Sequence, residues 1–397
     1  MMASLYGDGI HDDYPAIQAL LDSKIACVAL PAPQKCYTIS KCLKIYSNQE
    51  LRLDRFTVIR LGEMANCSML ENADPENGDR NICVTGGIWD MNHRKQWPNP
   101  YHFTHGGVRK SPEEIAAEQP ARDAERKKRT FSADYSGHCF RFNTVDHFIF
   151  RDVTIVNPVV YGFQMAFVTH FTIENITFDY TEGSPKLWNL DGVHIEGGCK
   201  NGFVRNLQGA CHDDLLAITS YDGKIGPIEN ITVSGLIAEH CHSAVRLLSI
   251  GEPVRNIHIS DIFGSFYVYC VIMSKYYSGV GQRGIFEHIT IENVHAAFSE
   301  GTADVAGHYG PLIDIKKELD IRHLTIRNVV RDETVCFHPT VGIGADTVIH
   351  DLLIENCTQT SGGHDMAFLK NDGQLRDAQI CNIFANGEKL GFGEYGM

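Results

Sequence analysis

Residues 173–178 read IENITF, and residues 228–233 repeat them almost unchanged as IENITV. From residue 148 onward, the same pattern of a turn-forming polar residue followed by alternating apolar residues returns at steps of 23 to 35 residues. The turn-forming residue is always Asp, Asn or His, the residue types that best tolerate a left-handed backbone at a tight bend. The instances are Asp152, Asn175, Asn206, Asn230, Asn256, His288, His323, Asp351 and Asp377.

A fixed repeat of short β segments with turns between them is typical of a solenoid. Val, Ile and Phe fill the segments with a period of two, and no helical stretch separates one segment from the next. The sequence therefore predicts an all-β chain wound as a parallel β-helix. Its coils would stack at the inter-strand spacing of roughly 4.7–4.9 Å, so residues one repeat apart become vertical neighbours. We expect Ile176, Leu207 and Ile231 to stack on one another.

Residues 7–22, GDGIHDDYPAIQALLD, look like a cap on the N-terminal end of this β-helix. Asp12 or Asp13 can serve as the N-cap of a short helix, and Pro15 suits its first turn. One face of the helix is apolar, so it would cover the open end of the core, as solenoids require. That face carries Ile17, Leu20 and Leu21.

Residues 93–137 break the repeat. They begin as a loop rich in Pro, Gly and aromatic residues and continue as a helical stretch with a basic end. A charge run of this kind is usually a solvated face, whereas a long insertion in a compact fold often carries function. We favour a solvated charged face, and the alternative is a lid or a subunit contact over a groove. Residues 1–397 are then a single domain, and the insertion is where the chain could form an oligomer.

The composition limits the class of protein. A formal net charge of −14 disfavours a nucleic-acid binder, and no stretch is long and apolar enough to span a membrane. The first residues lack the basic and apolar segments of a signal peptide. The 13 cysteines are spread singly, without a Cys-x-x-Cys pair, which disfavours a disulfide framework. We therefore expect a cytoplasmic protein with no nucleic-acid or membrane partner and no cofactor.

Three carboxylates lie in two short sequence motifs. Residues 189–191, NLD, open one predicted strand, and residues 212–214, HDD, open another about one repeat later. Stacking would bring Asp191, Asp213 and Asp214 into one groove on adjacent coils. Cleavage of a glycosidic bond needs one protonated carboxyl for the leaving oxygen and one carboxylate to activate water or attack the sugar, and close like charges raise one pKa. The alternative is three surface acids on turns.

From about residue 148 to residue 275, the sequence resembles glycoside hydrolase family 28, the polygalacturonases, with a looser match at the N-terminal cap. Residues 189–192, NLDG, match the family's Asn-Thr-Asp-Gly, and residues 212–215, HDDL, match its Gly-Asp-Asp followed by an apolar strand. Residues 245–251, VRLLSIG, match Gly-His-Gly-Leu-Ser-Ile-Gly, and residues 273–275, MSK, match Arg-Ile-Lys.

The resemblance implies a right-handed parallel β-helix and an inverting hydrolase of pectic oligosaccharides. It assigns Asp213 as the proton donor, and Asp191 with Asp214 as the holders of the attacking water. The acid and base of an inverting pair are expected to stand about 6.5–9.5 Å apart. Two departures change the surroundings of the acids: Arg246 replaces the family's histidine, and Met273 replaces the arginine of Arg-Ile-Lys.

The candidate substrate-binding residues are Asn189, His212, Arg246 and Lys275. Lys275 stands where the family places a lysine that contacts the sugar carboxylate, and the guanidinium of Arg246 can grip a carboxylate with two hydrogen bonds. We therefore expect a uronic acid, of galacturonate type, beside the cleaved bond. Two alternatives stay open: the cations only balance the three acids, or Met273 makes the pocket more apolar and favours a neutral or deoxy sugar.

Other functions compete with hydrolysis. A β-helix polysaccharide lyase or uronate epimerase would use Lys275 or Arg246 as a base, often with calcium on the acids. A tailspike-like β-helix would bind glycan without cleaving it, although binding alone does not need three acids in one groove. We favour an exo-acting hydrolase, because the insertion at 93–137 would close one end of the groove.

Two further groups of residues have weaker signals. Residues 240–242, HCH, resemble a metal cluster only superficially, because alternating residues of a strand face opposite ways, so we expect no metal site. Several aromatic residues near the acids could stack on sugar rings, although in a β-helix such residues more often belong to the core. They are Trp188, Tyr267, Tyr269, Tyr276 and Tyr277.

Overall fold

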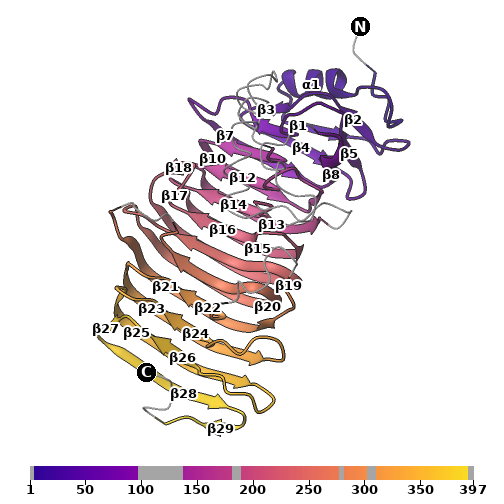
Figure 1. The fold of residues 1–397 in the computed structure, drawn as a ribbon. Helices are drawn as coiled ribbons and strands as arrows, with labels where there is room; N and C mark the ends of the chain where they lie inside the picture. Colours follow the sequence, from indigo (N-terminus) through magenta and orange to yellow (C-terminus); the bar gives the residue numbers. More distant parts are fainter. Residues whose placement is uncertain (1–3, 97–136, 181–188, 277–280, 302–309, 392–397) are drawn as a thin grey trace, which may run out of the picture.

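The structure is a computed structural model that describes residues 4–96, 137–180, 189–276, 281–301 and 310–391. These residues form one long stack of coils, with helix α1 (Tyr14–Asp22) at the N-terminal end and the C-terminus near the other end (Figure 1). Twenty-seven strands belong to one continuous sheet, and two short strands form a separate hairpin. Successive coils pair in parallel. The predicted right-handed parallel β-helix is confirmed.

The strands fall into three groups along the chain. Before the insertion they are β1 (Cys27–Leu30), β2 (Tyr37–Ile39), β3 (Leu43–Ile45), β4 (Gln49–Leu53), β5 (Val58–Leu61), β6 (Leu70–Asn72), β7 (Asp79–Thr85) and β8 (Ile88–Asp90), followed by a 3-10 turn, η1 (His93–Lys95). The central strands are β9 (Phe140–Asn143), β10 (Val145–Arg151), β11 (Thr154–Val156), β12 (Phe163–Ala166), β13 (Thr169–Asp179), β14 (Val193–Glu196), β15 (Lys200–Ala210), β16 (Asp214–Thr219), β17 (Tyr221–Asp222), β18 (Lys224–Ile225), β19 (Ile228–Leu248) and β20 (Val254–Ser274). The last are β21 (Gly284–Phe298), β22 (Ile313–Ile315), β23 (Leu319–Asp332), β24 (Val341–Ile343), β25 (Val348–Thr360), β26 (Leu369–Asn371), β27 (Gln374–Leu375), β28 (Ala378–Ala385) and β29 (Glu388–Lys389).

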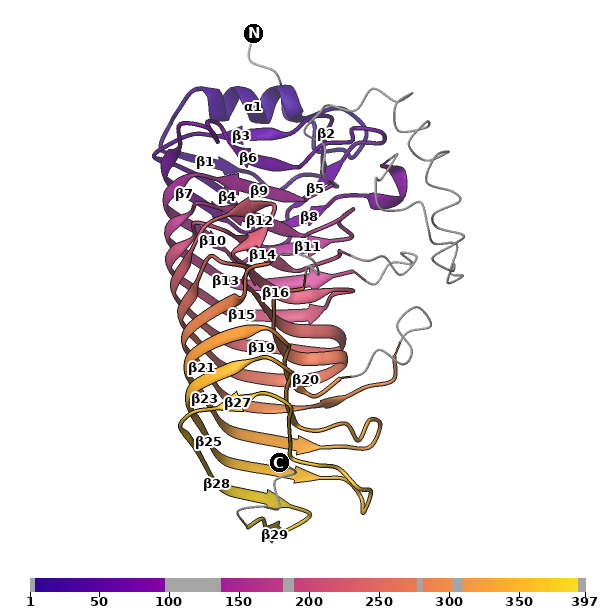
Figure 2. The ribbon, with the colours of Figure 1, turned by 60° about the vertical axis from the view of Figure 1, so that its left-hand side comes forward.

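Helix α1 covers the first coil, as predicted (Figure 2). Pro15 lies in its first turn, and Asp13 stands at the N-cap position. The Asp13 side chain does not cap the helix; its buried carboxylate accepts hydrogen bonds from the backbone N–H groups of three residues outside it. Asp13 thereby ties the start of the helix to the first coil. Ile17 and Leu21 are buried in the core, and Leu20 is partly buried against it.

The strands around the acidic residues stack in register. Strand β12 pairs with β14, β14 with β16, β16 with β19, and β19 with β20. Because side chains alternate along a strand, neighbouring columns of this stack face opposite ways. The column in the core holds Ile195, Ile218, Leu247 and Met273. The column facing away from the core holds Gln164, His194, Ala217, Arg246 and Ile272.

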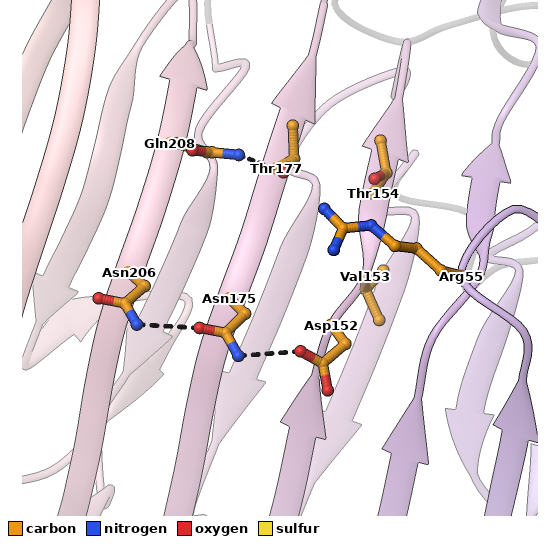
Figure 3. A pocket seen from close by; sticks show the side chains of 8 residues that line it. All are labelled: Arg55, Asp152, Val153, Thr154, Asn175, Thr177, Asn206 and Gln208. Atoms are coloured by element: carbon orange, nitrogen blue, oxygen red, sulfur yellow. Dashed lines mark hydrogen bonds between the residues drawn. The ribbon is translucent and has the colours of Figure 1, made fainter.

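The central coils turn at two left-handed residues rather than one. Residues with positive φ form two vertical columns, and their side-chain amides hydrogen-bond from coil to coil. In one column, Asn206 donates to Asn175 Oδ1 at 2.9 Å, and Asn175 donates to Asp152 Oδ1 at 2.8 Å (Figure 3). In the other, Asn230 donates to Asn201 Oδ1 at 2.9 Å. These two amide ladders fix the positions of the bends along the stack.

The predicted stacking was therefore wrong in one step. Leu207 lies on Ile176, but Ile231 lies on Gly202. The reason is that the third turn residue of the repeat, Asn206, belongs to one ladder and the fourth, Asn230, belongs to the other. Both ladders use Asn, Asp and His, so residue type alone does not separate them. Eight of the nine predicted turn residues have positive φ, and Asp377 does not.

All 13 cysteines are free thiols, and eight of them are buried. They fill small spaces along the core as apolar residues do, in agreement with the predicted absence of a disulfide framework.

Several predictions concern residues outside the described ranges. Residues 97–136, which make up most of the insertion, are among these, as are Trp188 and Tyr277. The roles of the insertion as a lid or subunit contact stay predictions, and so does the single-domain organisation. Within the described ranges, no helix has the length and apolar character needed to cross a membrane.

Candidate active site

The two acidic motifs, residues 189–191 and 212–214, lie on adjacent coils, as predicted. Strand β14 begins two residues after Asp191, Asp214 opens β16, and the two strands pair in parallel. Between them, the backbone N–H of Gly192 donates to the carbonyl oxygen of Asp214 at 2.9 Å. Asp191 and Asp214 are buried, whereas Asp213 keeps 18% of its side chain exposed. The structure thus brings the three acids together and leaves Asp213 the most accessible of them.

Asp191 is paired with a histidine of the same coil. Its Oδ2 lies 2.5 Å from Nδ1 of His194, whose Nε2 lies 3.2 Å from Thr219 Oγ1. The His194 ring is fully buried and stacks on Tyr161 with ring centroids 4.2 Å apart. Burial, reinforced by the two neighbouring acids, raises the pKa of Asp191 well above its usual range, and burial lowers the pKa of His194 to about 4. One short hydrogen bond between Oδ2 and Nδ1 thus joins the two side chains.

Asp213 is held from the coil before it and faces a histidine of the coil after it. Its Oδ2 accepts a hydrogen bond from the backbone N–H of Asn189 at 2.9 Å, and its Oδ1 lies 3.7 Å from His242 Nδ1. Burial raises the pKa of Asp213, and His242 opposes part of that rise. A carboxyl group with a raised pKa at the edge of the site is suited to donate a proton. His212, the residue before it, is half-buried.

Of the three acids, Asp214 has the largest number of polar partners. Its Oδ1 accepts hydrogen bonds from Ser243 Oγ at 2.5 Å and from Tyr269 OH at 2.7 Å. Its Oδ2 lies 2.9 Å from Arg246 Nε, an ion pair whose geometry does not satisfy a hydrogen bond. These contacts stabilise a carboxylate. Tyr269 is buried, so it holds Asp214 instead of stacking on a sugar.

Arg246 also contacts a fourth carboxylate. Its Nη2 donates to Asp222 Oδ2 at 3.3 Å, and Asp222 belongs to the hairpin of β17 and β18. Burial opposes the charge of Arg246, but the carboxylates around it, Asp214 first, keep its pKa well above the usual value. Glu196 of β14 accepts a hydrogen bond from the backbone N–H of Lys224 at 2.9 Å and so anchors this hairpin, and burial raises the pKa of Glu196 to about 7.

The other two residues of the Arg-Ile-Lys match have different surroundings from those expected. Lys275 forms an ion pair with Glu318 and keeps 11% of its side chain exposed. Met273 lies in the hydrophobic core, between Leu247 and Ile315 of the neighbouring coils. The expectation that Met273 makes one side of the pocket apolar is therefore wrong, because strand alternation turns its side chain toward the core.

The separation of the acids also differs from the expected value. Asp213, Asp214 and His242 each offer one possible ligand atom, and these three atoms lie within 4.8 Å of one another. The closest oxygens of Asp213 and Asp214 are therefore nearer than the separation of about 6.5–9.5 Å that is typical of inverting pairs. The spacing of these two acids does not by itself argue for inversion.

Four residues that the sequence analysis did not assign to the site lie in it, namely Asp222, His194, His242 and Ser243. His194 carries a usable signal, because it follows Asp191 by three residues at the start of the same strand. His242 lies in the HCH segment; the segment turns Cys241 into the core, as predicted, and the bulges around Cys241 bring His242 to Asp213. Asp222 has no local signal, since it reaches Arg246 only through the hairpin.

A cavity on another face of the coils contains none of the predicted site residues. It has a volume of about 260 Å³ and lies along one of the amide ladders (Figure 3). Its lining is polar and consists of Arg55, Asp152, Val153, Thr154, Asn175, Thr177, Asn206 and Gln208.

Solved structures with the same fold include two exopolygalacturonases and a phage tailspike. The family 28 exopolygalacturonase of Yersinia enterocolitica is 15% identical, with a TM-score of 0.64 over 98% of this chain and 78% of that one. The exopolygalacturonase of Thermotoga maritima is 16% identical, with a TM-score of 0.64 over 97% and 90% of the two chains. The tailspike of E. coli bacteriophage HK620, solved with a pentasaccharide, is 11% identical, with a TM-score of 0.62 over 96% and 64%. At these identities the likeness shows the fold.

The sequence itself matches one family. No curated protein sequence matches the chain. Residues 122–263 match Glycosyl hydrolases family 28, and this segment contains Asp191, Asp213, Asp214 and Arg246. The family resemblance read from the motifs is therefore confirmed: the chain carries a glycosyl hydrolases family 28 region and is a polygalacturonase-like glycosidase.

Proposed function

We propose that this chain hydrolyses glycosidic bonds of pectic, galacturonate-containing oligosaccharides by single displacement. One observation carries the proposal: Asp191, Asp213 and Asp214 meet on adjacent coils within the family match, and each has a different polar partner. Two carboxyl groups with different surroundings supply the acid and the base that this reaction needs.

In this proposal, Asp213 gives its proton to the leaving glycosidic oxygen. Asp214, stabilised as a carboxylate by two hydroxyl groups and Arg246, takes a proton from the attacking water. Asp191 orients that water through Oδ1, a buried oxygen without a hydrogen-bond partner among the described residues. His194 binds the other oxygen and keeps Oδ1 in place. The bond from water to the anomeric carbon forms as the bond to the leaving oxygen breaks, which inverts that carbon.

The products of the first turnovers test this mechanism. Proton NMR of the first-formed sugar should show the anomer opposite to that of the substrate, and chromatography should show release of single units from one chain end. Inversion is proposed from the family resemblance, and the exo mode is supported by the two exopolygalacturonase folds. Retention of the anomer, or random cuts within a long polymer, would contradict these two points. Unsaturated ends that absorb in the ultraviolet would identify a lyase instead.

We also propose that the protein works in the cytoplasm on short imported oligosaccharides. The 13 free cysteines support this location, because thiols persist in reducing compartments. Fractionation of the source cells should recover the full-length protein with cytoplasmic markers, and efficient secretion of that product would refute the proposal.

A further inference from the structure

The cations of the site are already engaged by carboxylates of the protein. The single guanidinium of Arg246 contacts Asp214 and Asp222, and its side chain is only 14% exposed. The guanidinium also lies over the ring of Tyr276, with Cζ 5.9 Å from the ring centroid. Arg246 therefore has no spare charge to offer a substrate carboxylate.

Lys275 is engaged in the same way. It forms an ion pair with Glu318, and the pair has no net charge. The residue that stacks on Arg246 in the next coil is Ile272, which brings no charge, and Met273 is in the core. The structure thus places no free cation at the positions that the family match offers for one.

The side chains beside Arg246 carry more negative than positive charge. Asp191 is engaged by His194 Nδ1 at 2.5 Å, and Asp213 must hold its proton to act as the donor. Arg246 itself is flanked by two carboxylates, Asp214 and Asp222, so its one positive charge faces two negative ones. A substrate carboxylate beside Arg246 would meet two carboxylates for one guanidinium in a mostly buried place, where like charges repel each other more strongly than in water.

We propose that the sugar unit bound against Asp213 and Asp214 carries no carboxylate, and that a neutral or deoxy sugar occupies this subsite. The inference rests on the proposed glycosidase function and names the substrate class at its cleavage subsite. It replaces the uronic acid expected there from Lys275 and Arg246. The inference concerns this one subsite and leaves the uronic acids at other positions of the oligosaccharide as proposed above.

Matched sugars that differ only at C6 test the inference. With 4-nitrophenyl glycosides of galactose and galacturonate, and of glucose and glucuronate, the neutral member of a pair should have the higher kcat/KM, by at least about tenfold. Calorimetric titration of the Asp213→Asn variant with the free sugars, rhamnose included, gives the same comparison without turnover. Tighter binding or faster hydrolysis of the acidic member overturns the inference. If no glycoside and no pectic oligosaccharide is cleaved, the proposed function fails, while the binding ratio still decides the charge of the subsite.

A charge variant separates this explanation from a difference in shape. Glu318→Gln removes the carboxylate that pairs with Lys275, so the kcat/KM for the acidic member should rise about tenfold relative to the neutral member. Glu287→Gln is the matched control, because it removes the same charge from a half-buried position of β21, where Glu287 lies 3.9 Å from Arg255 and 3.6 Å from Arg322. If Glu318→Gln changes the ratio no more than the control does, the ion pair does not set the preference and the charge argument is wrong.

Discussion

Asp213→Asn should lower kcat on a cleaved pectic oligosaccharide by roughly 10²–10⁴-fold, the contribution typical of a general acid. The amide cannot give up a proton, so the leaving oxygen would depart as an unprotonated alkoxide. The fold should survive, because the side-chain oxygen of Asn can still accept the hydrogen bond from the backbone N–H of Asn189. Initial rates of reducing-sugar release, with circular dichroism of the same sample, measure both effects.

Asp54→Asn is the matched control for this experiment. Asp54 is an exposed turn residue between β4 and β5, so the substitution changes the net charge equally without touching the acids. Its rate should equal that of the unmodified protein. If Asp213→Asn loses less than a few-fold in kcat, or a substrate with a good leaving group loses as much as a natural one, Asp213 is not the proton donor.

Arg331→Met should lower the free energy of unfolding by about 3–5 kcal/mol, because it leaves a charge buried without its partner. Arg331 is fully buried and donates to Glu333 Oε2 from Nε at 2.9 Å and from Nη2 at 2.8 Å. It also donates to the carbonyl oxygens of Cys336 and His338, and so holds the loop between β23 and β24. Denaturant titration followed by circular dichroism measures the loss.

Two comparison variants test whether burial of the ion pair causes this loss of stability. Arg60→Met breaks an ion pair to Asp90 of similar length, 2.8 Å, but Arg60 is 50% exposed, so the expected loss is about 0–1 kcal/mol. The double variant Arg331→Met with Glu333→Gln should recover part of the stability, since no charge is then left unpaired. Equal losses for Arg331→Met and Arg60→Met would show that burial does not determine the cost.

The repeat predicted the fold because its alternation of apolar residues is kept through the coils from residue 148. It did not predict the register, as Ile231 shows. The bends of both ladders accept the same residues, since Asn, Asp and His all tolerate positive φ. Because the same residue types suit both bends of a coil, the type of a residue does not identify the bend at which it lies. The two bends are distinguished only by the pairing of whole strands, as in β15 with β19, where Gly202 pairs with Ile231.

The acids were predicted because they lie at the starts of two strands about one repeat apart, β14 and β16, which stacking brings together. Most of their partners were not, since His242, Ser243 and Tyr269 come from later coils and Asp222 from the hairpin of β17 and β18, whereas His194 lies in the same coil as Asp191. Lys275 was matched to a family position, but its ion pair with Glu318 joins residues 43 positions apart in the sequence. Met273 was given the wrong face because a three-residue match does not fix the phase of the strand.

The amide ladders have a direction along the molecule. A carboxylate can only accept hydrogen bonds, and an ammonium can only donate them. One ladder starts at Asp261, which accepts from Asn293 at 3.1 Å, and it ends where the ammonium of Lys389 donates to Asn382 Oδ1 at 3.3 Å. The amides between these ends all donate toward the N-terminus, and they belong to Asn293, Asn328, Asn356 and Asn382.

A coil added within this ladder would therefore need Asn or Gln at that position, a side chain that both accepts and donates. An Asp there would leave the oxygen of the preceding amide without its donor and would begin a new ladder. Asp261 stands at such a beginning, because the residue beneath it in the stack is Gly235, which has no side chain to receive a hydrogen bond.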